Sequence, residues 1–452
     1  MRVLVIGGGI GGLCLAHGLR GAGIDVEVCE RTRVRSDWLQ GYRIHLNPDG
    51  CRALHRCLPA ANWAAFDATA GSDEGGFSFY DQRLRRLAVV DRELLAAGEC
   101  GPVARHRSVS RIRLRDVLLR GFDPDVLHEG REFVRYEHIA GGRVVAHFAD
   151  ESTAVADLLV GADGSNSRVR GQYLPELRRL DTGVLNIAGR YPLTEANAAR
   201  LPEQLQWGAA NVIPPRSDWM FVAAWRTPRR SVEGAGPDGG APDGGAPDAA
   251  GRDAAGQAAA ALAAAALAAA RADSEDYVLW AYAAARSTFP ADVAALDGAA
   301  LRDLTLSRMD GWADGLRTLV AGADPATVDT VTLRSMPRLT PWPASQVTLL
   351  GDAIHNMTPM AGIGANTALR DASVLRDALV EVAAGRRELV AAVAEYEEQM
   401  RTYANRAIRL SLDNARRAVS GARLPRLAFR SVLRLAEAVP PLKRAMFSDL
   451  GT

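Results

Sequence analysis

Five glycines fall within residues 7–12, between a short apolar run and a segment with helical spacing. Residues 3–6 are apolar throughout, as in a strand that is buried in a parallel sheet, and residues 10–19 carry apolar positions at helical spacing. Residues 26–29 form a second apolar run of strand length. The order strand, glycine-rich turn, helix, strand predicts a βαβ unit of a doubly wound α/β fold.

The three glycines of the G-x-G-x-x-G spacing each have a physical role in such a unit. Gly7 permits the tight turn, Gly9 lets a pyrophosphate approach the backbone, and Gly12 lets helix and strand pack closely. The N-terminus of the helix offers N–H donors and a partial positive charge to that anion. Glu30 ends the second strand, where it would accept hydrogen bonds from a ribose. Together with the neighbouring Arg31, these residues predict a dinucleotide site.

Two further turns that combine an acidic residue with glycine follow strands later in the chain. Asp163 and Gly164 end the segment DLLVGADG, and Gly351 and Asp352 follow the apolar strand 347–350. A carboxylate at the end of a parallel strand stands where ligands bind in open α/β sheets. Asp352 can accept hydrogen bonds from the hydroxyls of a polyol. The two turns predict a second half-site for the dinucleotide.

A loop containing Pro359 joins the second turn to a helix that begins near Gly364, Ala365 and Asn366. The N-terminus of that helix can stabilise negative charge on a bound ring. A fold that binds only NAD needs no such C-terminal half-site, so the motifs favour FAD as the dinucleotide.

The motifs resemble those of the class A flavoprotein monooxygenases, the family typified by para-hydroxybenzoate hydroxylase and salicylate hydroxylase. The matching positions are, in chain order, the glycine turn with Glu30, the helix motif R-x-x-L-x-x-x-L at Arg111, Leu114 and Leu118, the DG motif Asp163-Gly164 and the GD motif Gly351-Asp352. The resemblance covers residues 1–420 in organisation, and the combination of three motifs is highly specific.

The resemblance implies a Rossmann-type, glutathione-reductase-like FAD-binding domain with an inserted mixed β-sheet substrate domain and C-terminal helices. It implies non-covalent FAD, with Asp352 on the ribitol and Arg111 in contact with the cofactor. It also implies that Asp163 and Gly164 serve both FAD and the electron donor, either NADPH or NADH.

We expect the FAD-binding domain to be discontinuous, formed by residues 1–75, 100–175 and 335–385. Residues 76–99 and 176–334 would form the substrate domain, and residues 386–452 a C-terminal helical region. Period-two aromatic segments predict substrate-domain strands at 183–191, 205–213, 219–225 and 277–282. Residues 232–272 are rich in Gly, Pro and Ala, which predicts a flexible surface insertion.

The reaction implied by the resemblance is carried by the cofactor. NAD(P)H reduces the flavin, O2 adds to form a C4a-hydroperoxide, and one oxygen atom passes to an electron-rich substrate. The expected activity is hydroxylation or epoxidation of a hydrophobic small molecule, aromatic or polycyclic, of the natural-product type.

Few residues can be assigned to the substrate. Residues 41–46 match a family segment beside the isoalloxazine, which makes Arg43 and Ile44 candidate cofactor contacts. His45 is a candidate base that removes a phenol proton, although a strand histidine satisfied by the backbone explains it equally well. Arg190 ends a middle strand and would bind an anionic group or the flavin edge, or else is merely solvated.

Other functions fit parts of the sequence. A flavin-dependent halogenase needs a pocket lysine and a W-x-W-x-I-P segment, and this chain lacks both, because its only lysine is Lys443. A same-fold flavin reductase would differ in not consuming O2. A non-catalytic FAD- or ligand-binding protein would keep the fold without turnover, but the intact glycines and both acidic motifs favour an enzyme.

Charge and cysteine content narrow the partners. The 54 Lys and Arg residues against 53 Asp and Glu residues give a net charge of +1, whereas nucleic-acid binders are strongly basic. Five cysteines without a C-x-x-C pair fit reduced thiols in a cytoplasmic protein without a metal site. The partners expected are a small hydrophobic substrate and O2, and the sequence leaves the oligomeric state open.

Residues 424–447 are basic and apolar together, which suits either a helix on a membrane surface or a terminal helix docked on the body with solvated arginines. Docking is favoured, because Pro425 and the pair Pro440-Pro441 would cut the helix short.

Overall fold

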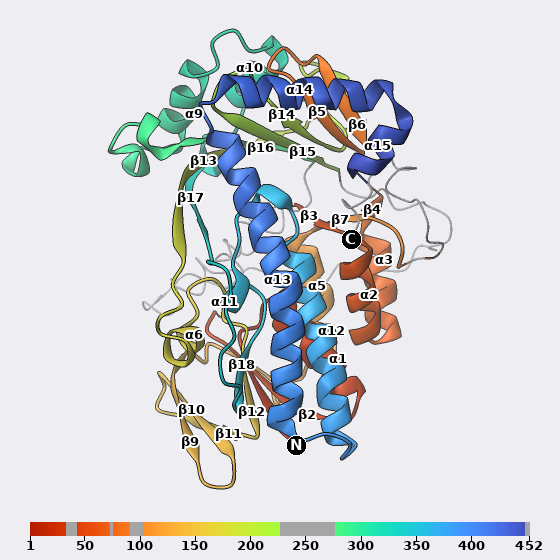
Figure 1. Cartoon of the computed structure of the whole chain (residues 1–452), viewed down its shortest axis with the longest axis vertical. Coiled ribbons are helices and arrows are strands. Elements are labelled where there is room, and N and C mark those ends of the chain that lie inside the picture. Colours follow the sequence, from red (N-terminus) through yellow and green to blue (C-terminus); the bar gives the residue numbers. More distant parts are fainter. Residues whose placement is uncertain (33–42, 73–75, 91–100, 102, 227–275, 448–452) are drawn as a thin grey trace, which may run out of the picture.

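The computed structural model describes residues 1–32, 43–72, 76–90, 101, 103–226 and 276–447. Within these residues, two large sheets lie toward opposite ends of an elongated molecule (Figure 1). The long helix α13 (Leu389–Val419) runs from one end toward the other. The predicted insertion 232–272 and residues 91–99 of the predicted substrate domain lie outside the described residues.

The five-stranded sheet, at the lower end of Figure 1, is parallel throughout and has the strand order β18-β12-β1-β2-β8. Its strands are β1 (Arg2–Ile6), β2 (Asp25–Glu30), β8 (Leu127–Glu129), β12 (Leu158–Gly161) and β18 (Val347–Leu349). The strands β1 and β12 are buried along almost their whole length, as expected where a parallel sheet is covered on both faces. The predicted α/β fold is confirmed.

Helices and a small antiparallel sheet pack around this parallel sheet. Helices α1 (Ile10–Gly21), α12 (Gly364–Ala383) and α13 lie side by side (Figure 1). The antiparallel sheet β11-β10-β9 contacts β1 and β12. Its strands are β9 (Phe133–Ile139), β10 (Arg143–Phe148) and β11 (Thr153–Ala156).

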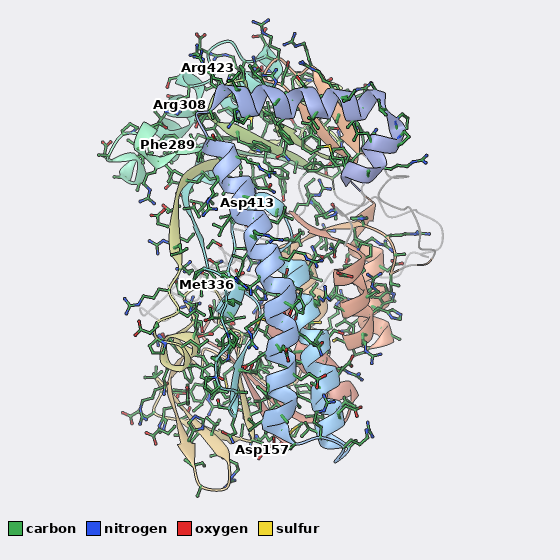
Figure 2. All side chains as sticks on the ribbon, in the orientation of Figure 1. Asp157, Phe289, Arg308, Met336, Asp413 and Arg423 are labelled. Atoms are coloured by element: carbon green, nitrogen blue, oxygen red, sulfur yellow. The ribbon has the colours of Figure 1, made fainter. Side chains whose placement is uncertain are left out.

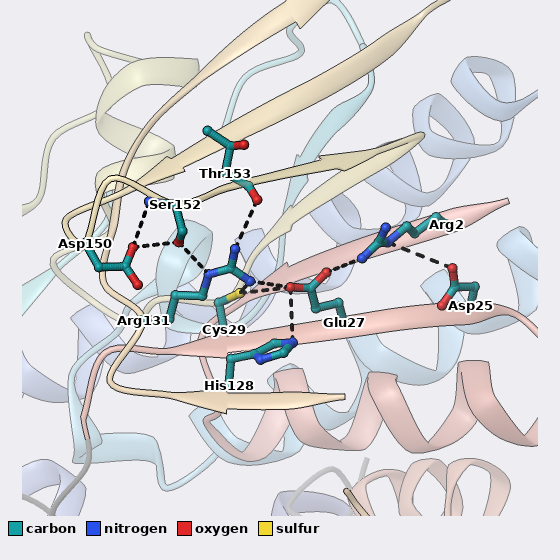
Figure 3. A network of polar contacts seen from close by, with 9 residues as sticks. All are labelled: Arg2, Asp25, Glu27, Cys29, His128, Arg131, Asp150, Ser152 and Thr153. Carbon is teal, nitrogen blue, oxygen red and sulfur yellow. Dashed lines mark hydrogen bonds and ion pairs between the residues drawn. The ribbon is translucent and has the colours of Figure 1, made fainter. Parts of the chain in front are cut away.

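A buried carboxylate ties these two sheets together (Figure 3). Glu27 of β2 is 5% exposed and lies 2.5 Å from Nη2 of Arg2 and 2.5 Å from Nη1 of Arg131. His128 of β8 contacts the same carboxylate at 3.2 Å. Arg131 also donates to the Ser152 hydroxyl and to the Thr153 carbonyl at the start of β11. One carboxylate therefore links β1, β2 and β8 with the antiparallel sheet.

A second three-stranded sheet lies between the two large ones (Figure 1). It has the order β3-β7-β4, with β3 (Arg43–Leu46), β4 (Gly71–Ser72) and β7 (Arg107–Ser110). The helices beside it are α2 (Pro48–Cys57), α3 (Ala60–Thr69) and α5 (Arg111–Leu119). The hydroxyl of Ser110 and the amide of Asn47 accept backbone N–H groups at the starts of α5 and α2, so each side chain caps its helix.

The seven-stranded sheet, at the upper end of Figure 1, has the order β17-β13-β16-β15-β14-β5-β6 and is antiparallel except for the pair β14–β5. Its strands are β5 (Phe77–Tyr80), β6 (Arg86–Val90), β13 (Leu180–Pro192), β14 (Ala209–Val212), β15 (Trp219–Trp225), β16 (Tyr277–Ala285) and β17 (Asp329–Ser335). On one face, Val222, Trp280 and Tyr282 join a core with α9 (Gly298–Ser307) and α10 (Asp314–Ala321).

The predicted strands 183–191, 219–225 and 277–282 are confirmed, but the strand predicted at 205–213 is wrong at its start. That stretch begins with the end of a 3-10 turn, η2 (Glu203–Leu205), and only Ala209–Val212 forms a strand. Gly208 has a φ of +64°, which interrupts an extended backbone before β14.

Short elements complete the described chain. They are α6 (Arg168–Tyr173), α7 (Glu195–Ala198), α11 (Asp352–His355), η3 (Arg286–Thr288), η4 (Val293–Ala295), η5 (Pro325–Thr327) and η6 (Pro359–Ala361). Among all the helices described, none combines the length and the hydropathy that crossing a bilayer requires.

The C-terminal residues form two helices, α14 (Arg423–Ala438) and α15 (Pro440–Phe447), and α14 packs on β6. Pro425 does not cut α14, because it stands in the first turn, where a missing N–H costs no helical hydrogen bond. The expectation of solvated arginines is also wrong for Arg426 and Arg430, which are 6% and 5% exposed. Pro440 starts the second helix, as the sequence predicted for a break at this point.

Candidate functional site

At two positions of the glycine-rich turn a side chain would collide with the backbone. Gly7 follows β1 with a φ of +117°, and its N–H donates to the Cys29 carbonyl at 2.8 Å. A Cβ at Gly7 would lie 2.3 Å from the Ala162 carbonyl oxygen. A Cβ at Gly12 would lie 2.2 Å from the carbonyl oxygen of Gly7 itself. Both positions therefore require glycine.

Gly9 differs from its neighbours because a Cβ there would meet nothing within 4 Å. It is the N-cap of α1, which has no side-chain cap and no acidic residue in its first turn. The first N–H groups of a helix have no intrahelical acceptor, and this end of the helix carries partial positive charge. Open space beside such donors suits a phosphate.

Glu30, at the end of β2, holds the same turn from the side. Its carboxylate is buried and accepts the N–H of Gly8 at 2.7 Å and the N–H of Thr32 at 2.9 Å. Each carboxylate oxygen has a further lone pair, so Glu30 can also accept from a ribose hydroxyl. The neighbouring Arg31 is exposed.

Arg111 and Arg115 share one face of α5 but have different surroundings. Arg111, chosen from the sequence, is the exposed first residue of the helix. Arg115 is buried and donates its Nε to the carbonyl of Gly8 at 3.4 Å, which brings it to the glycine-rich turn. Sequence reasoning missed Arg115, although its i+4 spacing from Arg111 was a usable signal.

Asp163 and Gly164 form a turn after β12, with Gly164 at a φ of +75°. One oxygen of Asp163 accepts the N–H groups of Arg168 and Val169 at the start of α6, at 2.7 and 3.2 Å. The other oxygen, Oδ1, is buried and has no hydrogen-bond partner among the described residues. Burial raises the pKa of Asp163 above its ordinary value, despite these hydrogen bonds. Asp163 thus keeps an unused acceptor.

The turn at Gly351 and Asp352 is held from behind by Asp371 of α12. Asp371 is fully buried and accepts the Gly351 N–H at 2.7 Å, His355 Nε2 at 2.6 Å and the Tyr403 hydroxyl at 2.6 Å. Burial lowers the pKa of His355, but the charge and hydrogen bond of Asp371 outweigh it, so the pKa of His355 is raised. Asp352 itself is exposed at the first position of α11.

Arg170 joins the two acidic turns and was also missed from the sequence. Its guanidinium is largely buried and donates to the Ala353 carbonyl at 2.7 Å and to the Ser165 carbonyl at 3.0 Å. Burial lowers the pKa of Arg170, and the charges of Asp163 and Asp352 act against that effect. Its place on α6, directly after the DG turn, was the available signal.

The N-terminus of α12 resembles that of α1. Its N-cap is Ile363, with no side-chain cap and no acidic residue in the first turn, and Gly364 and Ala365 are partly exposed. Asn366 is buried. Its side-chain amide accepts the Asn47 N–H and donates to the His45 carbonyl, both at 2.9 Å. Asn366 therefore positions β3 against the start of α12. Pro359 is exposed in the preceding loop, in η6.

Strand β3 connects this helix start with the seven-stranded sheet. Arg43 donates to the Ser108 hydroxyl and to the carbonyls of Gly208 and Ala224, at 3.0 and 3.3 Å. Ile44 packs against the core of the parallel-sheet half. Gly41 and Tyr42, the first two residues of the segment predicted to lie beside the flavin, are outside the described residues.

His45 has a side-chain partner that the sequence did not reveal. Its Nε2 and the Nδ1 of His106 share a hydrogen bond of 2.8 Å, and the two rings stack with centroids 4.9 Å apart. The backbone carbonyl of His45, and not its ring, is what Asn366 binds. The ring of His45 is therefore paired with a second imidazole and not with the backbone group that Asn366 binds.

Arg190 lies on a different sheet from the other candidates. It is half-buried on β13, with its guanidinium over the Tyr277 ring at 4.7 Å from the centroid. It pairs with Leu279, so it shares the sheet face that also carries Phe221 and Trp225. Met360, from the loop before α12, packs beside Trp219 on that face. The loop thus reaches from the parallel-sheet half to the seven-stranded sheet.

The structure brings most candidates to one edge. Gly7, Asp163 and Gly351 follow β1, β12 and β18, which are adjacent parallel strands, and Glu30 ends the neighbouring β2. Carboxyl ends of parallel strands meet at the same edge of a sheet, where ligands bind in open α/β folds. Among the described residues, the edge has the unpaired Oδ1 of Asp163, the exposed carboxylate of Asp352 and two uncapped helix N-termini.

This arrangement is that of a dinucleotide-binding flavoprotein. The chain matches the FAD binding domain family over residues 1–231 and 318–411, and it belongs to that family. The family expected from the sequence motifs is confirmed.

Two relatives and one solved structure indicate the range of similar proteins. The chain is 31% identical over 414 residues to a dual O-methyltransferase/FAD-dependent monooxygenase of Phaeosphaeria nodorum, covering 86% of this chain but only 41% of that protein. It is 28% identical over 409 residues to an FAD-dependent urate hydroxylase of Klebsiella oxytoca, covering 88% and 85% of the two chains. The chain thus spans less than half the length of the Phaeosphaeria relative.

A crystal structure from Photorhabdus luminescens, described as an FAD containing monooxygenase, has the same fold. It is 42% identical, with a TM-score of 0.77, and the match covers 93% of this chain and 98% of that one.

The residues at the edge fit FAD by their own chemistry. The open space at Gly9 beside the uncapped start of α1 suits a pyrophosphate. The exposed carboxylate of Asp352 and the unused oxygen of Asp163 are acceptors, as a ribitol chain with several hydroxyl donors requires. The uncapped start of α12 supplies positive potential for a ring that carries negative charge.

Proposed function

We propose that this protein is an FAD-dependent, NAD(P)H-consuming monooxygenase that hydroxylates or epoxidises a hydrophobic, aromatic or polycyclic small molecule. The observation that carries the proposal is the row of adjacent strand ends with two uncapped helix N-termini, one suited to a pyrophosphate and one to an anionic ring. The relatives named as FAD-dependent monooxygenases support the reaction class.

For the cofactor, we assign the adenosine half to the first turn. Gly9 and the start of α1 would bind the pyrophosphate, and Glu30 would bind the ribose. Arg31 and Arg111 stand exposed near this half, and Arg115 would approach through its contact with Gly8.

We assign the flavin half to the later turns. Asp352 would accept from the ribitol, and Asp163 with Gly164 would serve the flavin and the nicotinamide donor. The residues from Pro359 to Asn366 would lie beside the ring, with Arg43 and Ile44 on β3 opposite. When bound, the flavin would accept a hydride from NAD(P)H and activate O2 for transfer to the substrate.

The substrate would lie between β3, the start of α12 and the face of the seven-stranded sheet that carries Phe221. Three observations support this placement. Arg43 crosses from β3 to the carbonyls of Gly208 and Ala224, Met360 packs on the same sheet, and aromatic side chains provide an apolar surface there. This assignment makes residues 76–99 and 176–334 the substrate domain and residues 1–75, 100–175 and 335–385 the FAD domain.

In this arrangement His45 takes the proton from a phenolic substrate. His106 accepts or returns that proton through the hydrogen bond between the two rings, so the charge is shared with a second imidazole. His45 must be neutral to accept this proton. Arg190 would bind an anionic group on the substrate from the neighbouring sheet.

The first experiment is the visible absorbance of the purified protein, before and after NADPH or NADH is added under nitrogen, and again after air is admitted. We expect a yellow protein that bleaches with the donor and recovers its colour in air. Recovery that needs no O2 would favour the flavin reductase instead. A protein that takes up no FAD would favour a ligand-binding role and would overturn the assignment. We expect this enzyme to act in the cytoplasm.

A further inference from the structure

Helix α14 exposes several of its apolar residues and buries two of its arginines, Arg426 and Arg430. Leu424 is 80% exposed and Leu435 is 55% exposed, and both lie on the outer side of a helix that packs on β6. We call the exposed apolar row the leucine stripe; its residues are Leu424, Leu427, Val432, Leu435, Val439 and Leu442. The four that belong to α14 are three or five residues apart, which keeps them on one side of that helix, and Val439 and Leu442 follow at its end and in α15. An apolar row of this kind marks an interaction surface.

The buried side of α14 fixes this orientation. Arg430 lies 3.1 Å from the carboxylate of Asp81, which is fully buried. Arg426 donates to the Asp218 carbonyl and to the carbonyls of Arg417 and Ala418 at the end of α13. Rolling the helix to hide its leucines would break the ion pair of Arg430 with Asp81, which Arg85 also holds, and would break the carbonyl contacts of the buried Arg426. The stripe is therefore held outward.

The surroundings of the stripe are basic. Arg423, Arg434 and Arg444 are exposed along the two helices, and Arg85 and Arg86 are exposed beside β6. The only acidic residue between positions 423 and 447 is Glu437.

Glu437 adds little negative charge to this surface because it is already paired. Its carboxylate lies 3.1 Å from Lys443 and 3.6 Å from Arg86, and it also accepts the Val89 N–H. Figure 2 shows Arg423 at the start of α14, at the end of the molecule opposite to Asp157. Arg434 and Arg85 share one carboxylate, that of Asp81, with the buried Arg430, so the surface combines exposed leucines with an excess of positive charge at one end.

The charge and the size of the surface decide which partner fits. A second copy of this chain would bring arginines against arginines. A helix of 16 residues is about 24 Å long and about 10 Å wide, so its face offers roughly 250 Å², against about 800 Å² per partner in a stable interface. An anionic lipid surface needs no such area, since it takes up the leucines and attracts the arginines together.

We propose that the leucine stripe and its exposed arginines dock the protein on an anionic membrane surface. The leucines enter the boundary between headgroups and acyl chains, and Arg423, Arg434 and Arg444 bind lipid phosphates. The helix lies in the plane of the surface and does not cross it. The proposal does not depend on the proposed enzyme activity, because vesicle binding can be measured without substrate or NAD(P)H.

The test is co-sedimentation of the flavin-loaded full chain with vesicles. One set contains phosphatidylglycerol and phosphatidylcholine in equal parts, and the other contains phosphatidylcholine alone. We expect binding to the anionic set that weakens as salt is added, since surface charges are screened. The double variant Leu427→Glu/Leu435→Glu should lose at least about tenfold in partition coefficient. The triple variant Arg423→Gln/Arg434→Gln/Arg444→Gln should lose about tenfold on the anionic set.

The matched control is Val134→Glu/Leu180→Glu, which adds the same charge at two exposed apolar residues outside the stripe. It should bind vesicles as the parent does. Circular dichroism and flavin occupancy report whether each variant folds, and the triple arginine variant remains a test if the leucine variant does not.

Four results would overturn the proposal. Failure of the parent to bind either vesicle set would do so, as would binding that the stripe variants leave unchanged. Sedimentation showing a dimer that the leucine variant dissociates, without vesicle binding, would assign the stripe to a second copy. Binding that appears only after deletion of residues 232–272 would assign it to that segment of the chain.

Discussion

The two large sheets of this protein are specified by different kinds of residue. In the five-stranded parallel sheet, the functional edge depends on single positions where only one residue type fits, such as Gly7 and Gly12, whose Cβ atoms would meet backbone oxygens. In the seven-stranded sheet, the corresponding surface is made of alternating side chains such as Phe221 and Trp225, none of which is fixed by the backbone. The first sheet should tolerate few substitutions and the second many.

The largest effect should come from filling the contact between Gly12 and Gly7. We expect Gly12→Val to lower the unfolding free energy by more than about 3 kcal/mol. The valine side chain would collide with a backbone oxygen, which cannot move aside as a side chain can. Urea unfolding checks this. The matched control is Gly9→Ala, where nothing lies within 4 Å. It should change stability by no more than about 1 kcal/mol, yet weaken FAD binding at least about tenfold.

Equal stability losses in these two variants would contradict the comparison. Such losses would mean that every position of the turn is needed for stability and that the open space at Gly9 is not a ligand site. A Gly9→Ala protein with full FAD affinity would remove the pyrophosphate assignment alone, without affecting the steric argument for Gly12.

The next effect should come from Asp371, behind the Gly351 turn. Asp371→Ala removes the acceptor of a backbone N–H and leaves His355 buried without its partner, so we expect a loss of about 3–5 kcal/mol. Because the folded-state pKa of His355 is raised, the contribution of the pair is present below the unfolded pKa and is lost as pH rises through the folded pKa. Unfolding measured at several pH values should show the largest loss at the acidic end.

Asp371→Asn is the control for this prediction. It keeps an oxygen for the Gly351 N–H but loses the charge, so it should cost less than Asp371→Ala and should flatten the pH dependence. A loss that is the same at every pH for both variants would show that the charge on His355 contributes nothing.

Most of the parallel-sheet half could be predicted from the sequence, and the physical reason is local. The glycines, Glu30, Asp163 and Asp352 follow strands at fixed positions, so a one-dimensional pattern determines their common edge. The end of β13 and the start of β16 are also close to prediction, because aromatic alternation identifies strands.

What could not be predicted depends on contacts between distant residues. Asp371 reaches Gly351 across 20 positions, and His45 meets His106 across 61, with no spacing rule to connect them. Arg115 could not be predicted from the family motif, because the motif includes Arg111 and not Arg115. The inward arginines of α14 depend on Asp81, at a sequence separation of 349 residues.

A smaller effect, on the pH dependence of the unfolding free energy, should come from Glu397, where α13 packs on the parallel sheet. Glu397 is 1% exposed beside β18, and burial raises its pKa to about 7, against hydrogen bonding from Thr348. Since the folded pKa exceeds the unfolded one, the wild-type protein loses stability as pH rises through about 7. Glu397→Gln avoids this loss, and its advantage should grow by about 3 kcal/mol between about pH 4 and about pH 8, a range that spans both pKa values.

Urea unfolding of both proteins across that pH range is the measurement. Glu395→Gln is a suitable control, because its carboxylate is on the same helix and 46% of its side chain is exposed. It should show no comparable pH-dependent gain. An advantage of Glu397→Gln that is independent of pH would mean that burial does not raise the pKa of Glu397 above its value in the unfolded chain.

The smallest effect on stability should come from Arg190 in the seven-stranded sheet, compared with Arg170 in the parallel-sheet half. Arg190→Met removes a half-exposed cation–π contact with Tyr277, so we expect less than about 1 kcal/mol of destabilisation and an FAD dissociation constant within about twofold of the parent. Arg170→Met, in the parallel-sheet half, removes two hydrogen bonds that join the acidic turns and should weaken FAD at least about tenfold. Fluorescence titration with FAD measures both. Because both variants lose the same charge, equal weakening would show that FAD affinity follows overall charge and is not confined to the parallel sheet.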